Sequence, residues 1–144
     1  MIIGSSVTRI GKEAFYDCGK ITDLIIPDSV TEIADSAFEN CSNIISVIIP
    51  DNVIYLGVSI FSGCSKLTSV TIGKSVTSIG AHVFSNCFSI EKVEFKDTVG
   101  WECVLEHDSL NVTKISSNDI ADAGIARSYL RDTYSKCYWH RTKV

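Results

Sequence analysis

The sequence predicts an α/β repeat solenoid, a fold in which short coils stack along one axis. The first observation is a column of cysteines, each 23 residues after the last: Cys18, Cys41, Cys64 and Cys87. The second is that each of them ends the same pattern, apolar-Phe-x-x-Cys. The third is that the pattern stops near residue 96. Self-similarity at a fixed spacing of this length is typical of repeat architectures.

Other positions keep the same register. Each repeat reads Leu-x-x-Val-x-Ile-Pro-x-x-Val-x-x-Ile-Gly-x-x-x-Ala-Phe-x-x-Cys, with modest substitutions. One repeat cannot bury its own apolar side, so stacking must close the core and the end repeats need caps. We therefore predict a solenoid of about four repeats over residues 1–96, the first one truncated, and a C-terminal cap over residues 97–144. The truncated start is compatible with a fragment of a longer array.

The first part of each repeat is predicted to be a β-strand. Residues 67–72 alternate at their end and are rich in β-branched side chains, which favour strands. The equivalent stretches are residues 23–26, 46–49 and 92–95. Proline or glycine follows three of the four strands, and proline cannot donate a hydrogen bond to a sheet.

The rest of each repeat contains a second strand and a turn. Shorter extended pieces are expected at residues 30–33, 53–56 and 76–79. The remaining third, with Ala-Phe at its centre, is predicted to form a single helical or 3₁₀ turn. Such a turn is too short to be an independent helix, so it depends on its neighbours.

The C-terminal segment follows different patterns. Residues 100–105 are predicted to form a strand, and a polar stretch follows over residues 106–118. Residues 122–134 have helical spacing, and their apolar side chains fall on one face: Ala123, Ala126, Leu130 and Tyr134. We therefore expect a cap made of a strand and a helix.

The cysteines divide into two groups. The four ladder cysteines occupy equivalent places, so their side chains should point in parallel, and burial in the core is favoured over disulfides or a zinc site. Cys103 and Cys137 lie in the C-terminal segment and could pair if the helix packs on the Trp101 strand. The sequence does not determine whether their Cα atoms approach within the ~6.8 Å that a bridge needs. Burial without a bridge is the favoured interpretation.

Residues 26–41, Ile-Pro-Asp-Ser-Val-Thr-Glu-Ile-Ala-Asp-Ser-Ala-Phe-Glu-Asn-Cys, and their copies ending at Cys64 and Cys87 resemble the leucine-rich repeat proteins of the BspA-like class. The resemblance covers roughly residues 1–96. It implies a right-handed solenoid with a parallel sheet on its concave face. It also implies a cell-surface or secreted protein of a host-associated bacterium or protist parasite, which adheres to host matrix proteins or to other microbes.

Composition excludes several classes of protein. The 144 residues are 45% apolar and 21% charged, as in a packed domain, and the net charge of −4 attracts neither nucleic acid nor an anionic membrane. No stretch approaches the ~20 apolar residues of a membrane span, and the N-terminus carries no secretory signal. Localisation at the cell surface or outside the cell therefore rests on the resemblance.

No residue pattern indicates an enzyme, a cofactor or a metal site. The histidines, His82, His107 and His140, do not stand at metal-ligand spacing, and no glycine-rich phosphate loop is present. Cys103 and His107 form the one local thiol–imidazole pair, and nothing else of a catalytic constellation accompanies it. We therefore expect no catalytic, cofactor-binding or metal-binding residues.

The outward-facing positions of the predicted strands are the candidate partner-binding site. Alternation along each strand places every second side chain outside. These candidates are Ile25, Ser46, Ile48, Ser69, Thr71, Lys92 and Glu94. Ile2, Ile25 and Ile48 would form an exposed β-branched strip, which marks an interaction site or reflects strand propensity alone.

Two functions from different classes remain. The favoured one is a non-enzymatic adhesion module that binds a protein or host-matrix partner through the concave sheet. The alternative is a structural or terminal capping segment of a longer surface repeat protein, without a ligand of its own. The open edge of the first coil further predicts self-association, or partial disorder, at that end.

Overall fold

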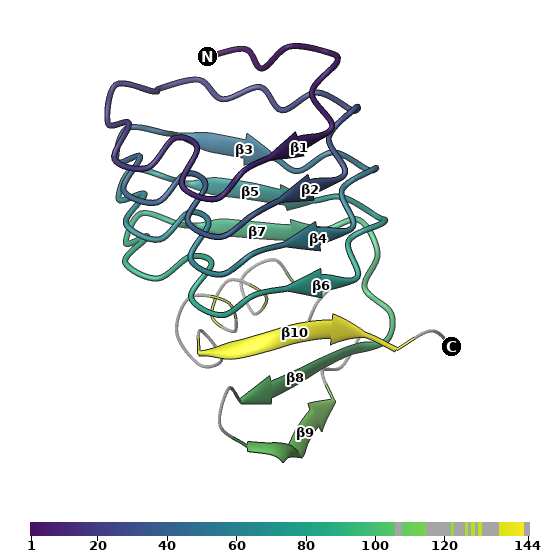
Figure 1. Cartoon of the computed structure of the whole chain (residues 1–144). Coiled ribbons are helices and arrows are strands. Elements are labelled where there is room, and N and C mark those ends of the chain that lie inside the picture. The colour runs from purple at the N-terminus through teal and green to yellow at the C-terminus, as the bar shows by residue number, and fades with distance from the viewer. Residues whose placement is uncertain are drawn as a thin grey trace.

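The computed structural model describes residues 1–105, 108–114, 122, 126, 128, 130 and 136–142. Stacked coils form the larger part of the molecule, and three strands of the C-terminal segment extend the stack at one end (Figure 1). The described strands are β1 Arg9–Ile10, β2 Glu32–Ile33, β3 Ser46–Ile48, β4 Tyr55–Leu56, β5 Ser69–Ile72, β6 Ser78–Ile79, β7 Lys92–Phe95, β8 Trp101–Leu105, β9 Asp108–Lys114 and β10 Cys137–Arg141.

The coils build two sheets. One sheet has three parallel strands in the order β3-β5-β7. The other has seven strands in the order β1-β2-β4-β6-β10-β8-β9, of which the first four are parallel. Each parallel pair joins residues 23 positions apart, such as Val47 with Val70 and Ile33 with Leu56. The predicted solenoid and its register are therefore confirmed.

The first predicted strand is the exception among the four. Within residues 23–26 the structure has only an isolated parallel bridge, between Ile25 and Ile2. The amide of Ile25 donates to the carbonyl of Met1 at 3.0 Å, and the amide of Ile3 donates to the carbonyl of Ile25 at 3.3 Å. This coil thus keeps strand-like pairing at one residue, and the prediction of a full strand there is wrong.

The core is made of the apolar columns. The phenylalanines stack face to face between adjacent coils, with ring centroids 5.2 Å apart for Phe15–Phe38, 5.4 Å for Phe38–Phe61 and 5.9 Å for Phe61–Phe84. Phe38, Phe61 and Phe84 are completely buried, whereas Phe15 is only partly covered. Phe38 and Phe61 are therefore each covered by one phenylalanine ring from the coil before and one from the coil after.

The ladder cysteines are free thiols, as predicted, and three of them are buried. Each of these three donates to the phenylalanine carbonyl of the preceding coil. Cys41 reaches Phe15 at 3.0 Å, and Cys87 reaches Phe61 at 2.9 Å. Burial raises the pKa of Cys41 to about 11 and that of Cys64 further. The thiols of Cys41 and Cys64 are therefore protonated near neutral pH.

The single turn predicted around Ala-Phe is present, closed in the first coil by the hydrogen bond from the amide of Tyr16 to the carbonyl of Glu13 at 3.1 Å, but it is not part of a helix. In the first coil the amide of Ala14 bonds within its own turn, to Gly11, whereas that of Phe15 donates to Ala37 of the next coil at 2.8 Å. Residues at two positions of every repeat have positive φ: Glu13, Asp17, Ser36, Asn40, Ser59, Gly63, His82 and Asn86. Left-handed residues four apart interrupt a right-handed helix, so the segment is a series of turns tied to its neighbour.

The C-terminal segment continues the seven-stranded sheet with reversed direction. β10 pairs antiparallel with β6 and with β8, so the last strand of the chain lies between them (Figure 1). Trp101 and Trp139 are buried against Phe95, with ring centroids 5.2 Å and 6.5 Å from it. These rings cover the apolar end of the last coil, which a solenoid must shield from water.

The cap prediction was partly correct. The predicted strand over residues 100–105 is confirmed as β8, but β9 and β10 were not anticipated. Of the predicted helix over residues 122–134, only residues 122, 126, 128 and 130 are described. Ala126 and Leu130 are buried, and the amide of Ala126 donates to the carbonyl of Asp122 at 2.9 Å. The rest of that helix lies outside the described residues.

Cys103 and Cys137 form a disulfide, with their Cα atoms 5.7 Å apart. The favoured expectation of burial without a bridge was therefore wrong, although both residues are buried. β8 and β10 are neighbours, with Trp139 opposite Cys103, and this pairing brings the two cysteines within bonding distance.

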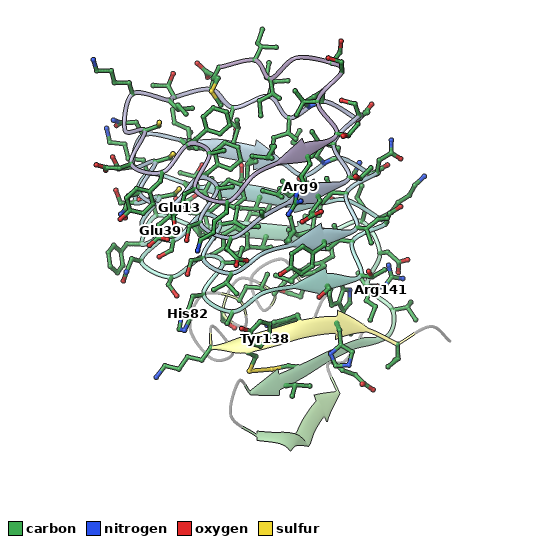
Figure 2. All side chains as sticks on the ribbon, viewed as in Figure 1. Arg9, Glu13, Glu39, His82, Tyr138 and Arg141 are labelled. Atoms are coloured by element: carbon green, nitrogen blue, oxygen red, sulfur yellow. A yellow bond between two sulfur atoms is a disulfide. The ribbon has the colours of Figure 1, made fainter. Side chains whose placement is uncertain are left out.

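Arg141 holds the end of the chain against the coils. Its guanidinium donates to the carbonyls of Val99 at 3.1 Å and Lys74 at 3.0 Å, and it contacts Asp97 at 2.5 Å. The same group lies 5.9 Å from the Trp101 ring centroid. Figure 2 shows this side chain at the edge of the stack opposite to the turns that carry Glu13 and Glu39.

Candidate functional site

Six of the seven candidate residues lie on one surface, the outer side of the three-stranded sheet, and Ile25 lies in an earlier coil, where it bridges to Ile2. We call this the outward face, defined by Ile25, Ser46, Ile48, Ser69, Thr71, Lys92 and Glu94. Strand pairing arranges six of them in two rows across the sheet. Ser46, Ser69 and Lys92 form one row, and Ile48, Thr71 and Glu94 form the other.

The alternation that predicted this face agrees with the burial pattern. Val47, Val70 and Val93 point into the core and are buried, while their neighbours in sequence are exposed or half-buried. The pleat of a strand sends successive side chains to opposite faces, so one register determines all of these orientations. The structure thus brings the six strand candidates together.

Isoleucines dominate the end of the outward face farthest from the C-terminal segment. Ile25 is 56% exposed and Ile48 is 63% exposed. Ile2, which bridges to Ile25, is 78% exposed. Contiguous exposed apolar side chains of this kind are uncommon outside interaction sites. The predicted β-branched strip is therefore present on the surface.

The other end of the outward face is polar and internally paired. Lys92 and Glu94 stand two residues apart on β7 and form an ion pair of 2.7 Å. The hydrogen bond from Lys92 lowers the pKa of Glu94. Both side chains are well exposed, so this pair contributes little to stability. The charges of Lys92 and Glu94 cancel each other, so this pair carries no net charge that would attract an ion.

A depression of about 600 Å³ adjoins the apolar end of the outward face. Ile25, Ser46 and Ile48 line it from the outward face, and Asp28, Asp51 and Lys96 line it from the turns beyond. Sequence reasoning missed these last three residues. Asp28 and Asp51 share one position of the repeat, and Lys96 stands where two other repeats have proline, so the repeat alignment contained a signal for them.

Asp51 is the electrostatic centre of that rim. Lys96 approaches its carboxylate to 2.8 Å, and Lys74 lies 4.0 Å away. The hydrogen bond from Lys96 lowers the pKa of Asp51. This cluster links three successive coils, because its members occupy neighbouring turns of the stack. Asp51 is therefore neutralised by the protein itself.

A second depression, of about 970 Å³, lies between the coils and the end of the chain. Ile54, Lys74, Thr77, Asp97, Val99 and Arg141 are among its lining residues. Arg141 and Asp97 are bound to each other there, and the arginine also holds backbone carbonyls. The side chains of Arg141 and Asp97 are thus already engaged in contacts that hold the C-terminal segment.

The two described histidines each contact one polar side chain. His82 contacts Ser85 at 3.2 Å, and His140 lies 3.4 Å from Glu102. Cys103 is in the disulfide, and His107 lies outside the described residues. In the part of the chain that the structure describes, no three side chains of His, Cys, Asp or Glu are grouped to hold a metal ion. Within that same part, no helix is long and apolar enough to cross a membrane.

Comparisons with solved structures find similar architectures in bacterial leucine-rich repeat proteins. A leucine-rich repeat protein of T. pallidum matches with 32% identity and a TM-score of 0.63, over 65% of this chain and 44% of that one. One from Bacteroides ovatus matches with 34% identity and a TM-score of 0.61, over 65% of this chain and 24% of that one. This chain therefore aligns with less than half the length of either relative.

A third leucine-rich repeat protein, from Eubacterium ventriosum, shares the fold at 21% identity and a TM-score of 0.57, over 67% of this chain and 26% of that one. No curated protein matches the sequence significantly. The family model for the BspA type leucine rich repeat region matches residues 1–101 in six copies. Together with the 23-residue register of the sheets, this match shows that the chain belongs to the BspA-type leucine-rich repeat family.

Proposed function

We propose that this protein is a non-enzymatic binding module that recognises a protein partner through the outward face. The observation that carries the proposal is the exposed isoleucine strip of Ile2, Ile25 and Ile48, next to the polar rows of the same sheet. Burying β-branched side chains removes apolar area from water, which drives most protein association. The leucine-rich repeat family as a whole is consistent with protein binding.

The rigidity of the face supports this role. Six of the seven candidate side chains project from strands that hydrogen-bond to one another and rest on a buried core, and Ile25 is held by its bridge to Ile2. A preformed surface loses little conformational freedom when it binds, so more of its contact energy appears as affinity. The expected concave curvature of the sheet would let a partner contact several coils at once.

A cell-surface or extracellular location fits both the family and the cap. Disulfides persist in oxidising compartments and are rare in the bacterial cytosol. The Cys103–Cys137 bridge is therefore the feature of this chain that favours export. The implied partners are host matrix proteins, which a surface-exposed module can reach.

The test replaces the isoleucines with the residue that a neighbouring coil carries. Threonine stands at the equivalent position 71, so an Ile25→Thr/Ile48→Thr variant keeps β-branched side chains and should fold. We expect its binding to an array of purified host matrix proteins to fall by about tenfold or more, a loss of roughly 1.4 kcal/mol.

The matched control is Ile54→Thr. Ile54 is 53% exposed but lies off the outward face, at a repeat position that is threonine in coils on both sides, Thr31 and Thr77. This variant should bind like the parent chain. Equal binding by all three proteins, with unchanged unfolding curves, would show that the outward face is not the site.

A structural role is the second candidate. The alignment with less than half the length of longer repeat proteins favours it, because a solenoid segment can serve simply to support its neighbours. This role predicts that neither the matrix array nor a parallel glycan array is bound by the intact chain. Self-association is distinguished from both by measuring molecular size at several concentrations.

A further inference from the structure

We propose that the partner presents an extended peptide segment in which an aliphatic side chain stands beside a lysine or arginine. This inference rests on the proposed function and assigns the chemistry of the ligand. The aliphatic side chain would enter the depression between Ile25 and Ile48, and the cation would meet Asp28 at its rim.

The lining of the depression selects an aliphatic group. Its apolar part is formed by Leu24, Ile25, Ile26, Ile48 and Pro50, and no aromatic ring belongs to the lining. Aromatic rings are the surfaces on which planar bases stack, and the protein is acidic overall, so a nucleic acid has nothing to recognise here. Branched aliphatic side chains pack well against isoleucine, because both surfaces are small and irregular.

The charge distribution selects a cation. Lys96 is the cation among the residues that line the depression, and it is paired with Asp51 at 2.8 Å. At the polar end of the outward face, Lys92 is paired with Glu94. Asp28 is exposed, and among the described residues no cationic side chain forms an ion pair with its carboxylate. Its backbone carbonyl accepts from Asn52 at 2.8 Å, which holds the turn in place.

The shape of the site selects an extended chain. The depression begins on the outward face and continues over the turn that follows β3, so apolar and acidic groups succeed one another along the surface. An extended peptide alternates its side chains and can place neighbouring residues over both parts. A free cation alone would gain nothing from the isoleucines.

The test uses a library of random peptides displayed on phage, selected against the intact, oxidised chain. We expect the recovered peptides to combine isoleucine, leucine or valine with an adjacent lysine or arginine. Synthetic copies should bind Asp28→Asn about two- to fivefold more weakly than the parent, as expected for an exposed ion pair, and added salt should reduce this difference.

Glu13→Gln is the matched control for charge. Glu13 is an exposed carboxylate on the turns at the edge of the stack opposite to Arg141 (Figure 2), and it does not line the depression. Its neutralisation changes the net charge by the same amount as that of Asp28. This variant should bind the peptides like the parent. The Ile25→Thr/Ile48→Thr variant should lose them.

The outcomes separate the two proposals. Peptides that require Ile25 and Ile48 but show no cation preference, or that bind Asp28→Asn as well as the parent, would overturn this inference and leave the proposed function standing. Recovery of no peptide, or of peptides indifferent to the isoleucines, would overturn this inference, and the matrix-protein array with the Ile25→Thr/Ile48→Thr variant decides the proposed function separately. A second copy of the chain as the sole binder of the outward face, seen as dimerisation that displaces the peptides, would also overturn the inference.

Discussion

Replacing Phe61 with alanine should destabilise the protein by about 3–5 kcal/mol, the range for deleting a fully buried aromatic side chain. The ring of Phe61 is stacked between those of Phe38 and Phe84, so its removal opens a cavity in the middle of the ladder. Coils that contact only their neighbours cannot close such a gap by rearranging a distant part of the fold. Equilibrium unfolding in denaturant measures the change.

Phe15→Ala is the internal control for this prediction. Phe15 belongs to the same column but has a described ring neighbour only on one side, Phe38, and it is partly exposed. Its replacement should cost clearly less, because less buried area is lost and water can fill the space. If the two variants unfold at the same denaturant concentration, the continuous stack does not carry the stability assigned to it.

Removing the disulfide should cost about 3–4 kcal/mol. The bridge closes a segment of 34 residues, and a cross-link of that length restricts the unfolded chain by roughly this amount. We therefore expect a Cys103→Ala/Cys137→Ala variant to unfold at lower denaturant, and to show no further change when a reductant is added. The parent chain should shift toward the variant under the same reductant.

Thiol counting provides an independent check of the same bridge. The unfolded, unreduced protein should expose four thiols, those of the ladder, and six after reduction. A Cys64→Ala variant should lose one thiol and still respond to reductant, because its residue lies outside the bridge. Six thiols in the unreduced chain would contradict the pairing of Cys103 with Cys137.

The register of the coils was predictable because equivalent residues recur every 23 positions in the sequence. A spacing of 23 residues sets which positions are equivalent, and strand alternation then orients Val70 inward and Thr71 outward. One sequence therefore predicts both the buried columns and six members of the outward face. What those members bind is not contained in the pattern, since exposure and strand propensity favour the same side chains.

The turns show how a correct period can accompany an incomplete prediction of the local structure. The Ala-Phe segment has apolar spacing compatible with one helical turn, but its alternate amides bond to the next coil. These bonds depend on a neighbour 22 residues away, so no short stretch of the sequence reveals them. Asp17, Asn40 and Gly63 do carry a signal, because these residue types tolerate positive φ better than others.

The sequence by itself determined the solenoid, its register, the free cysteine ladder and the division between inward and outward side chains, because all of these repeat. The features that do not recur in each repeat could be seen only in the tertiary structure. The Cys103–Cys137 bridge depends on the pairing of β8 with β10, and the rim of Asp28, Asp51 and Lys96 depends on three coils meeting at one edge. Contacts between residues far apart in the chain arise from stacking, and stacking brings together groups that no local pattern relates.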